Sequence, residues 1–223
     1  MTRQLFIQAI VKFLSGLILV SLLLFIPAGT IRFWNAWLLI GILFVPMFAA
    51  GVVMMIRSPE LLKKRLNNKE EENDQKLVIM LSGLMFLASF VIAGLNFRFG
   101  WLVMPKGAVI AAAVFFLLSY VMYAEVLREN VYLSRTVEVQ ENQKVVDTGL
   151  YGVVRHPMYT STVVLFLSMS LVLGSPVSFV ITLCYIPIIA KRIKNEEMVL
   201  EKGLDGYIEY KQKVKYRLIP FIW

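Results

Sequence analysis

The chain has 223 residues, 58% of them hydrophobic, and a mean hydropathy of +0.70. This composition exceeds that of soluble globular domains and predicts an integral membrane protein. The formal net charge of +8 fits basic loops facing the cytoplasm and anionic lipid better than it fits a nucleic-acid partner. With one cysteine, Cys184, and one histidine, the chain has no internal disulfide and lacks the ligands of a conventional zinc or iron site, so we expect no metal.

Four apolar stretches in the N-terminal half are long enough to cross a bilayer. They cover residues 5–27, 33–56, 77–97 and 107–127. Pro46 predicts a kink in the second stretch. The charged loop that follows, residues 57–76, opens with Ser58-Pro59-Glu60, which is typical of a helix start. We therefore expect a short amphipathic helix on the membrane surface there.

A polar insert, residues 129–156, separates these spans from two shorter apolar stretches, residues 160–173 and 177–190. As a helix with a rise of 1.5 Å per residue, each short stretch would reach roughly 21 Å, less than the roughly 30 Å hydrocarbon core. We therefore expect a helical hairpin there, re-entrant or fully spanning. Residues 195–223 are predicted to form an amphipathic cytoplasmic helix and a short end. Only Val137–Gln140 in the insert alternates as a strand would.

The predicted fold is an all-α integral membrane protein with four transmembrane helices, this short C-terminal hairpin and the amphipathic helix. Residues 1–128 would carry the spans and residues 129–223 the binding region of one structural domain. With the N-terminus inside, all but three of the 23 Lys and Arg residues avoid the outer turns; the exceptions are Arg32, Arg98 and Lys106. The positive-inside rule then puts both termini in the cytoplasm, at a bacterial or archaeal inner membrane or the endoplasmic reticulum.

Two polar clusters carry the candidate chemistry, and this orientation brings both to the cytoplasmic face. In the first, residues 155–159, Pro157 suits the first turn of a helix, where free backbone N–H groups and the positive dipole end favour an anion near His156. In the second, Arg192 and Glu196 are spaced to pair on one helix face. Each cluster also has a non-functional interpretation. His156 and Tyr159 could simply be side chains at the membrane interface, and Arg192 and Glu196 could belong to an ordinary solvated helix end. A charged pair directly below an apolar hairpin favours a functional site.

Residues 145–159, Val-Val-Asp-Thr-Gly-Leu-Tyr-Gly-Val-Val-Arg-His-Pro-Met-Tyr, resemble the signature of the isoprenylcysteine carboxyl methyltransferase family. These are integral membrane methyltransferases related to the phospholipid methyltransferases. The family's ending is similar to Arg192, Glu196–Glu197, Leu200, Tyr207, Tyr210 and Tyr-Arg-Leu-Ile-Pro at residues 216–220. The resemblance covers roughly residues 136–220. Two departures stand out: Ser161 replaces a common glycine, and the family often has a polar ligand near Thr136.

This resemblance implies that S-adenosylmethionine binds between the insert, the hairpin and the C-terminal helix, and that a lipid or lipidated acceptor enters from the bilayer. It implies that Glu196 contacts the cofactor and Arg192 binds the acceptor, so these two are the candidate catalytic residues. The candidate cofactor-binding residues are Gln143, Lys144, Val145, Val146, Tyr151, His156, Pro157, Met158, Tyr159 and Glu196.

The chemistry of the acceptor stays open between three groups. A carboxylate of the isoprenylcysteine type, which we favour, needs no base and would be clamped by Arg192. A phospholipid amine must lose a proton, for which Glu196 or Glu197 is the candidate base. Some other lipid is the third possibility.

Two further classes of function are compatible with the sequence. One is an NADPH-dependent membrane reductase of the sterol-reductase type, which has a related C-terminal pocket but is usually longer. The other is a non-enzymatic membrane or transport component, for which Glu125, near the end of the fourth span, is the supporting feature. The oligomeric state does not follow from the sequence.

Overall fold

The computed structural model describes residues 3–66, 73–133 and 137–223. These residues form helices and connecting segments without a β-strand, which confirms the predicted all-α class. Residues 137–140, whose alternation suggested a strand, have no regular structure, because their apolar side chains turn to separate partners. Val137 is buried against the cavity described below, and Val139 packs near Leu204. Thr136 and residues 67–72 of the charged loop lie outside the described residues.

The four predicted spans correspond to α1 (Arg3–Ala28), α2 (Trp34–Arg57), α4 (Asn73–Phe99) and α5 (Lys106–Glu129). Between α2 and α4 lies the expected short helix, α3 (Pro59–Leu66). Lys12, a charged residue within α1, places its Nζ 2.5 Å from the Leu66 carbonyl oxygen at the end of α3. This contact gives the lysine of an apolar helix a polar partner.

The C-terminal hairpin differs from its prediction in the second arm. Its first arm, α6 (Pro157–Val172), is a 16-residue apolar helix. The second continues from α7 (Pro176–Thr182) into α8 (Tyr185–Gly203), and together they make a 28-residue segment long enough to cross a membrane. The described residues therefore contain five candidate spans, and the predicted count of four is not confirmed.

The separate helix expected from residue 195 is absent for a related reason. The chain stays helical through the charged residues 191–197, since Lys, Arg and Glu are good helix formers. Residues 195–203 therefore belong to α8, and α9 (Tyr207–Lys213) is the one helix described in the remaining tail.

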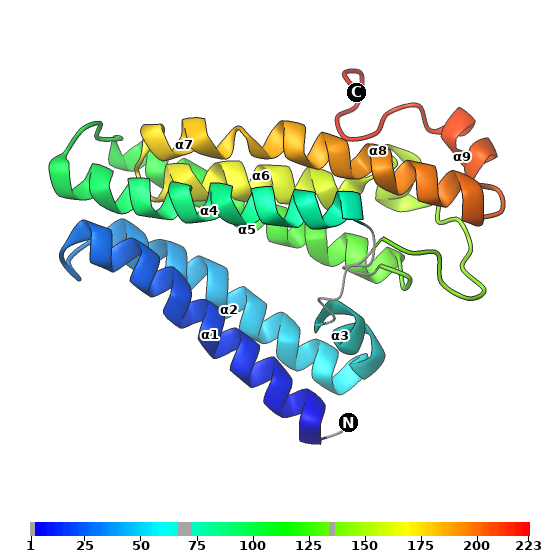
Figure 1. The fold of residues 1–223 in the computed structure, drawn as a ribbon, viewed down its shortest axis with the longest axis horizontal. Coiled ribbons are helices and arrows are strands. Elements are labelled where there is room, and N and C mark those ends of the chain that lie inside the picture. Colours follow the sequence, from blue (N-terminus) through cyan, green and yellow to red (C-terminus); the bar gives the residue numbers. More distant parts are fainter. Residues whose placement is uncertain (1–2, 67–72, 134–136) are drawn as a thin grey trace.

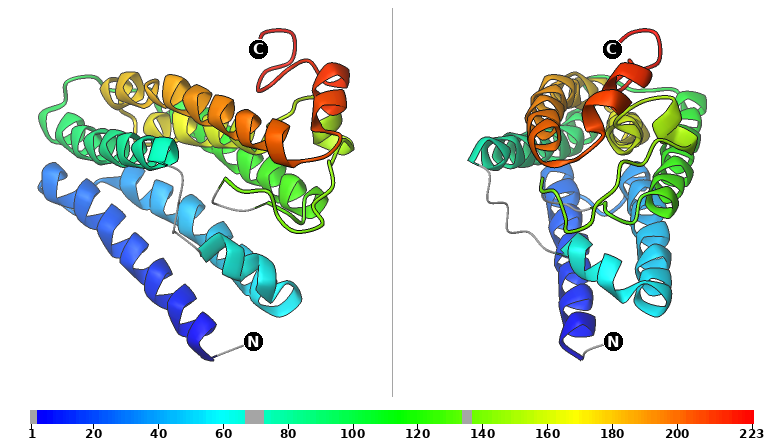
Figure 2. Two further views of the ribbon diagram at one scale, coloured as in Figure 1. Left: turned by 45° about the vertical axis from the view of Figure 1, so that its right-hand side comes forward. Right: turned by 90° about the vertical axis from the view of Figure 1, so that its right-hand side faces the viewer.

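Helices α4 to α8 lie side by side along the long axis of the molecule (Figure 1). Helices α1 and α2 diverge from them at the end where the N-terminus lies. The same arrangement is visible from two other directions (Figure 2). Helix α5 packs along α6, and α4 packs against α1, α7 and α8. Gly94 allows the close approach of α4 to α1, because a Cβ there would lie 2.7 Å from the Leu24 carbonyl oxygen.

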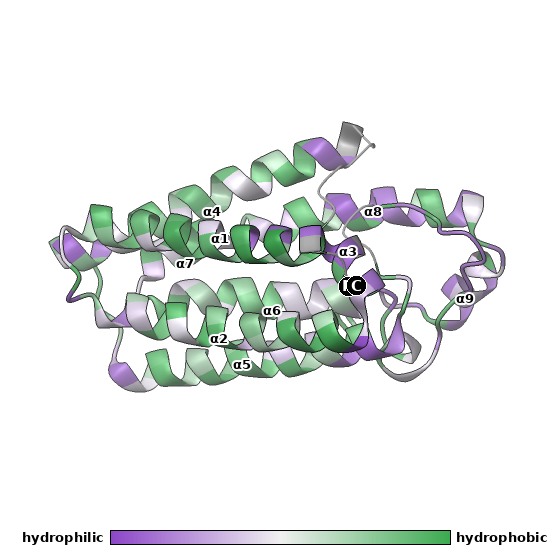
Figure 3. Ribbon diagram, turned by 90° about the horizontal axis from the view of Figure 1, so that it is seen from below, coloured by the Kyte–Doolittle hydropathy of each residue, from purple (hydrophilic) through white to green (hydrophobic). Residues whose placement is uncertain are grey.

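The bundle is apolar along most of its length, with hydrophilic residues concentrated where α3, the insert, the end of α8 and α9 meet (Figure 3). We call this region the polar end. The turns between α1 and α2, α4 and α5, and α6 and α7 all lie at the opposite end (Figure 1). Both clusters singled out in the sequence thus come together at one end of an apolar bundle.

Candidate active site

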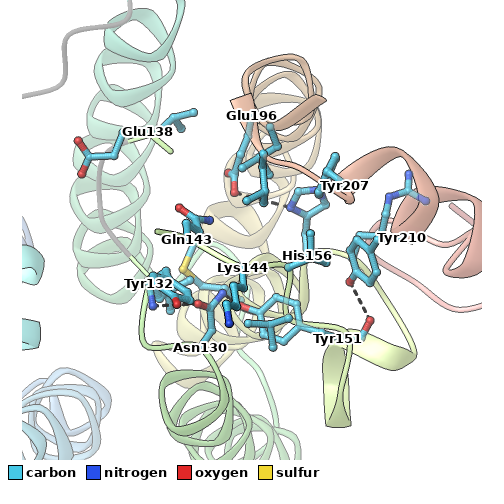
Figure 4. Close-up of a pocket in the computed structure, with 18 of the residues that line it drawn as sticks. Asn130, Tyr132, Glu138, Gln143, Lys144, Tyr151, His156, Glu196, Tyr207 and Tyr210 are labelled. Carbon is cyan, nitrogen blue, oxygen red and sulfur yellow. Dashed lines mark hydrogen bonds and ion pairs between the residues drawn. The ribbon is translucent and has the colours of Figure 1, made fainter. Parts of the chain in front are cut away.

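A cavity opens at the polar end between the insert, α6, α8 and α9 (Figure 4). Its volume is about 820 Å³, including the space at its mouth. Several residues predicted from the sequence share its wall: Gln143, Lys144, Val145, Val146, Tyr151, His156, Met158, Tyr159, Arg192 and Glu196. Pro157 is buried beside them as the first residue of α6. The fold therefore gathers the two sequence clusters around one space.

A short 3₁₀ turn, η1 (Gly149–Gly152), positions Tyr151 in this wall. The Tyr151 hydroxyl accepts a hydrogen bond from Asn130 Nδ2 at 2.9 Å, and its carbonyl oxygen accepts one from the Tyr210 hydroxyl at 2.7 Å. Gly149 has φ +50°, and a Cβ there would lie 1.5 Å from Glu129 Oε1. Glu129 uses that space to accept a hydrogen bond from the Leu150 N–H at 3.1 Å. The glycine is thus required by both conformation and space.

The start of α6 is held by the C-terminal tail. The backbone N–H groups of Arg155 and His156 donate to the carbonyls of Tyr216 and Arg217, both at 2.9 Å. The Tyr159 N–H donates to the His156 carbonyl at 3.0 Å. The sequence led us to expect free N–H groups here for an anion. For these three groups that expectation is wrong, because the tail and the helix turn itself occupy them.

Glu197 is the centre of a buried ionic cluster. Its carboxylate accepts from Arg155 Nε and Arg217 Nε, each at 2.8 Å, and lies 3.3 Å from His156 Nε2. The residue is only 2% exposed. A buried carboxylate is tolerated when such partners compensate its charge. Two guanidinium groups also stabilise the ionised form, which makes Glu197 a poor proton acceptor. Its role is to join α8, the start of α6 and the tail.

Tyr159 connects the two candidate catalytic residues. Its hydroxyl accepts a hydrogen bond from Arg192 Nε at 2.9 Å and donates one to Glu196 Oε2. The Glu196 side chain is 23% exposed, in contrast to the buried Glu197, and its Oε1 lies 3.9 Å from His156 Nδ1. The spacing of Arg192 and Glu196 correctly put them on one side of α8, and the Tyr159 phenol lies between them.

The lining fits a ligand that combines charged, polar and flat groups. Glu196 and His156 supply a carboxylate and an imidazole to one part of the wall. Tyrosine rings can pack against an aromatic base or a cationic centre. The apolar part of the wall includes Val145, Val146, Leu200 and Leu204.

Residues 106–205 match the model of the family described as Phospholipid methyltransferase. The matched region is similar to this family of integral membrane methyltransferases. It runs from the start of α5 to just beyond α8, slightly less than half of the chain, and contains most of the cavity wall. The resemblance found in the sequence motifs is thereby confirmed for this group, which also includes the isoprenylcysteine carboxyl methyltransferases. No curated protein matches the chain significantly.

Half of the cavity wall was not among the candidate catalytic or cofactor-binding residues. These residues are Asn130, Tyr132, Leu133, Val137, Glu138, Arg155, Leu200, Leu204, Tyr207 and Tyr210. Leu200, Tyr207 and Tyr210 had a usable signal, because they belong to the part of the sequence that resembles the family's ending, and a spacing of three puts the two tyrosines on one face of a helix. Nothing in the sequence around Leu133 or Val137 distinguishes them from other apolar residues of the insert.

Proposed function

We propose that the protein is a membrane methyltransferase that uses S-adenosylmethionine to methylate a lipid acceptor. The observation that carries the proposal is the junction of Arg192, Tyr159 and Glu196 in the wall of a cavity at the polar end of the bundle. The family match of residues 106–205 supports the methyltransferase part. When bound, the cofactor supplies an electrophilic methyl group. It would not require a metal from the protein.

On the cofactor side, Glu196 is the partner for a hydroxyl or ammonium group, since its carboxylate is partly exposed and is oriented by Tyr159. The Tyr151 ring, fixed by Asn130 and Tyr210, is suited to hold the adenine or the sulfonium. The remaining predicted contacts run along the insert and the start of α6: Gln143, Lys144, Val145, Val146, His156, Pro157, Met158 and Tyr159.

On the acceptor side, Arg192 precedes Glu196 by one helical turn toward the apolar part of α8. A lipid tail can remain in the bilayer while its polar group reaches Arg192, and the cofactor approaches from the polar end. By the distribution of basic residues, this end faces the cytoplasm. Methyl transfer is an in-line displacement, so holding the two reactants in line supplies much of the acceleration.

Two acceptor chemistries compete. The description of the matched family favours a phospholipid headgroup. A phospholipid amine must lose a proton, and Glu196 is the better base than the doubly paired Glu197. The signature-like motif and the guanidinium of Arg192 favour a carboxylate of the isoprenylcysteine type, which needs no base.

The test is a transfer assay with protein purified in lipid nanodiscs and S-adenosylmethionine labelled in its methyl group. Phosphatidylethanolamine and a farnesylated cysteine are offered separately, and the label in each lipid is counted. We expect the original protein to transfer label to one of the two acceptors, and we expect Glu196→Ala to transfer none. Glu201→Gln, which alters the exposed ion pair with Lys211, serves as the matched control on α8. Binding of NADPH in place of S-adenosylmethionine would favour the reductase alternative.

A further inference from the structure

Tyr207, the first residue of α9, carries a buried hydroxyl without a hydrogen-bond partner among the described residues. The residue is 4% exposed and belongs to the cavity wall. Buried hydroxyl groups in native proteins almost always have a partner, because an unpaired one loses its bond to water without compensation. A polar hydroxyl left unpaired at the wall of a cavity is therefore suited to a ligand.

The neighbouring tyrosines of the wall differ from Tyr207 in this respect. The Tyr151 hydroxyl accepts from Asn130, and the Tyr210 hydroxyl donates to the Tyr151 carbonyl. The Tyr159 hydroxyl accepts a hydrogen bond from Arg192 and donates one to Glu196, both in α8. These three phenols complete hydrogen bonds within the protein. Tyr207 is the exception.

The Tyr207 ring is held firmly, so its hydroxyl has a defined position. It packs in a buried cluster with Leu204, Tyr210 and Val214, and its ring centre lies 5.8 Å from that of Tyr210. Gly206 precedes it with φ +81°, a left-handed conformation that sets the direction of α9. This lining residue of the cavity therefore has a rigid support.

The surroundings of the hydroxyl are charged. Figure 4 shows Tyr207 beside His156, with Glu196 and Tyr210 to either side. Burial raises the pKa of the Tyr207 phenol, and the nearby carboxylates of Glu197 and Glu196 raise it further. The phenol therefore keeps its proton at neutral pH and can donate a hydrogen bond.

We propose that Tyr207 is a further cofactor-binding residue whose hydroxyl forms a hydrogen bond with the amino-acid end of the cofactor. This inference rests on the proposed function. The amino-acid end carries the carboxylate and the ammonium of S-adenosylmethionine, and the Glu196 carboxylate and the His156 imidazole lie beside Tyr207. The adenine, being flat and mostly apolar on its faces, is better matched to the ring of Tyr151 and to the valines of the insert.

The test compares two ligands that differ only in this end. S-adenosylhomocysteine retains the amino-acid group, whereas 5′-methylthioadenosine lacks it. Calorimetric titrations of the detergent-purified full chain are made with the original protein and with Tyr207→Phe. We expect the Kd for S-adenosylhomocysteine to rise about 5- to 10-fold and the Kd for 5′-methylthioadenosine to stay within about twofold. Tyr120→Phe, which removes a hydroxyl bound to the Leu43 carbonyl outside the cavity, should change neither.

A thermal unfolding measurement separates ligand binding from a structural role. Because the hydroxyl has no described partner, Tyr207→Phe should leave the ligand-free Tm equal or higher and should reduce the rise caused by S-adenosylhomocysteine. A lower ligand-free Tm with an unchanged ligand-induced rise would overturn the inference. So would equal affinities in the original and substituted chains, or equal weakening of both ligands. If the original protein binds neither ligand, the proposed function fails with it.

Discussion

Arg155, a residue of the cavity wall, forms an ion pair with Glu197, with Arg155 Nε 2.8 Å from Glu197 Oε1 and both side chains less than 5% exposed. Arg155 precedes α6, whereas Glu197 lies in α8. Arg155 Nη1 also donates to the Val214 and Lys215 carbonyls, at 2.6 Å and 2.8 Å, and thereby fastens the tail. The pair links three segments that are distant in sequence and shapes the wall that they share.

Removing this carboxylate should destabilise the fold. Glu197→Ala leaves Arg155 and Arg217 without their common partner, and breaking a buried ion pair typically costs about 3–5 kcal/mol. The free energy of unfolding, measured by denaturant titration in detergent, should fall by that amount. Glu201→Gln on the same helix removes only a partly exposed pair and should cost less than about 1 kcal/mol. Equal effects of both substitutions would argue against the central role of Glu197.

Replacing Arg192 should impair transfer more than cofactor binding. Arg192→Lys keeps a positive charge but loses the Nε–H that orients the Tyr159 hydroxyl at 2.9 Å. Because a small misplacement of reacting groups is costly, we expect methyl transfer to fall about 100-fold. The Kd for S-adenosylmethionine should change little. A variant with full transfer activity would show that Arg192 does not position the reaction.

The turn that holds Tyr151 should be intolerant of a methyl group. In Gly149→Ala the new Cβ would collide with the Glu129 carboxylate and would adopt a positive φ that alanine disfavours. We expect a loss of about 1–3 kcal/mol in unfolding free energy and weaker cofactor binding. Gly107→Ala is the control, since a Cβ there meets nothing within 4 Å. Unchanged stability of Gly149→Ala would mean that Glu129 moves aside freely.

The contact between α1 and α4 should depend on Gly94. A methyl group at this position would press on the Leu24 carbonyl oxygen, whereas one at Gly83 of the same helix meets nothing within 4 Å. Gly94→Ala should therefore lower the Tm in detergent through overpacking that costs about 1–3 kcal/mol. Gly83→Ala should leave the Tm unchanged or raise it. The opposite order would contradict the observed packing.

The parts of this structure that depend on local sequence could be predicted. Apolar length located four spans, and Ser58-Pro59-Glu60 marked the start of α3. The spacing of Arg192 and Glu196 put both on one side of α8. Long-range pairing could not be predicted in this way, since nothing near Glu197 indicates that Arg217 folds back onto it.

The same limit explains the errors at the hairpin and the start of α6. Helices α7 and α8 form one arm of the hairpin despite the break at residues 183–184, because both helices pack against α4. The tail occupies the N–H groups of Arg155 and His156, which local sequence leaves free. The length of this arm and the partners of these N–H groups therefore depend on tertiary contacts. The unpaired hydroxyl of Tyr207 likewise becomes visible only once its neighbours are known.

The central claim is that the cavity binds S-adenosylmethionine through Glu196. Its most direct test is calorimetric titration of the detergent-purified protein with S-adenosylmethionine and with NADPH, beside Glu196→Ala and Glu201→Gln. We predict a Kd for S-adenosylmethionine in the roughly 1 μM to 1 mM range typical of enzyme substrates, lost in Glu196→Ala and kept in Glu201→Gln, with no binding of NADPH. Binding of NADPH alone, or binding of S-adenosylmethionine that Glu196→Ala leaves intact, would contradict it.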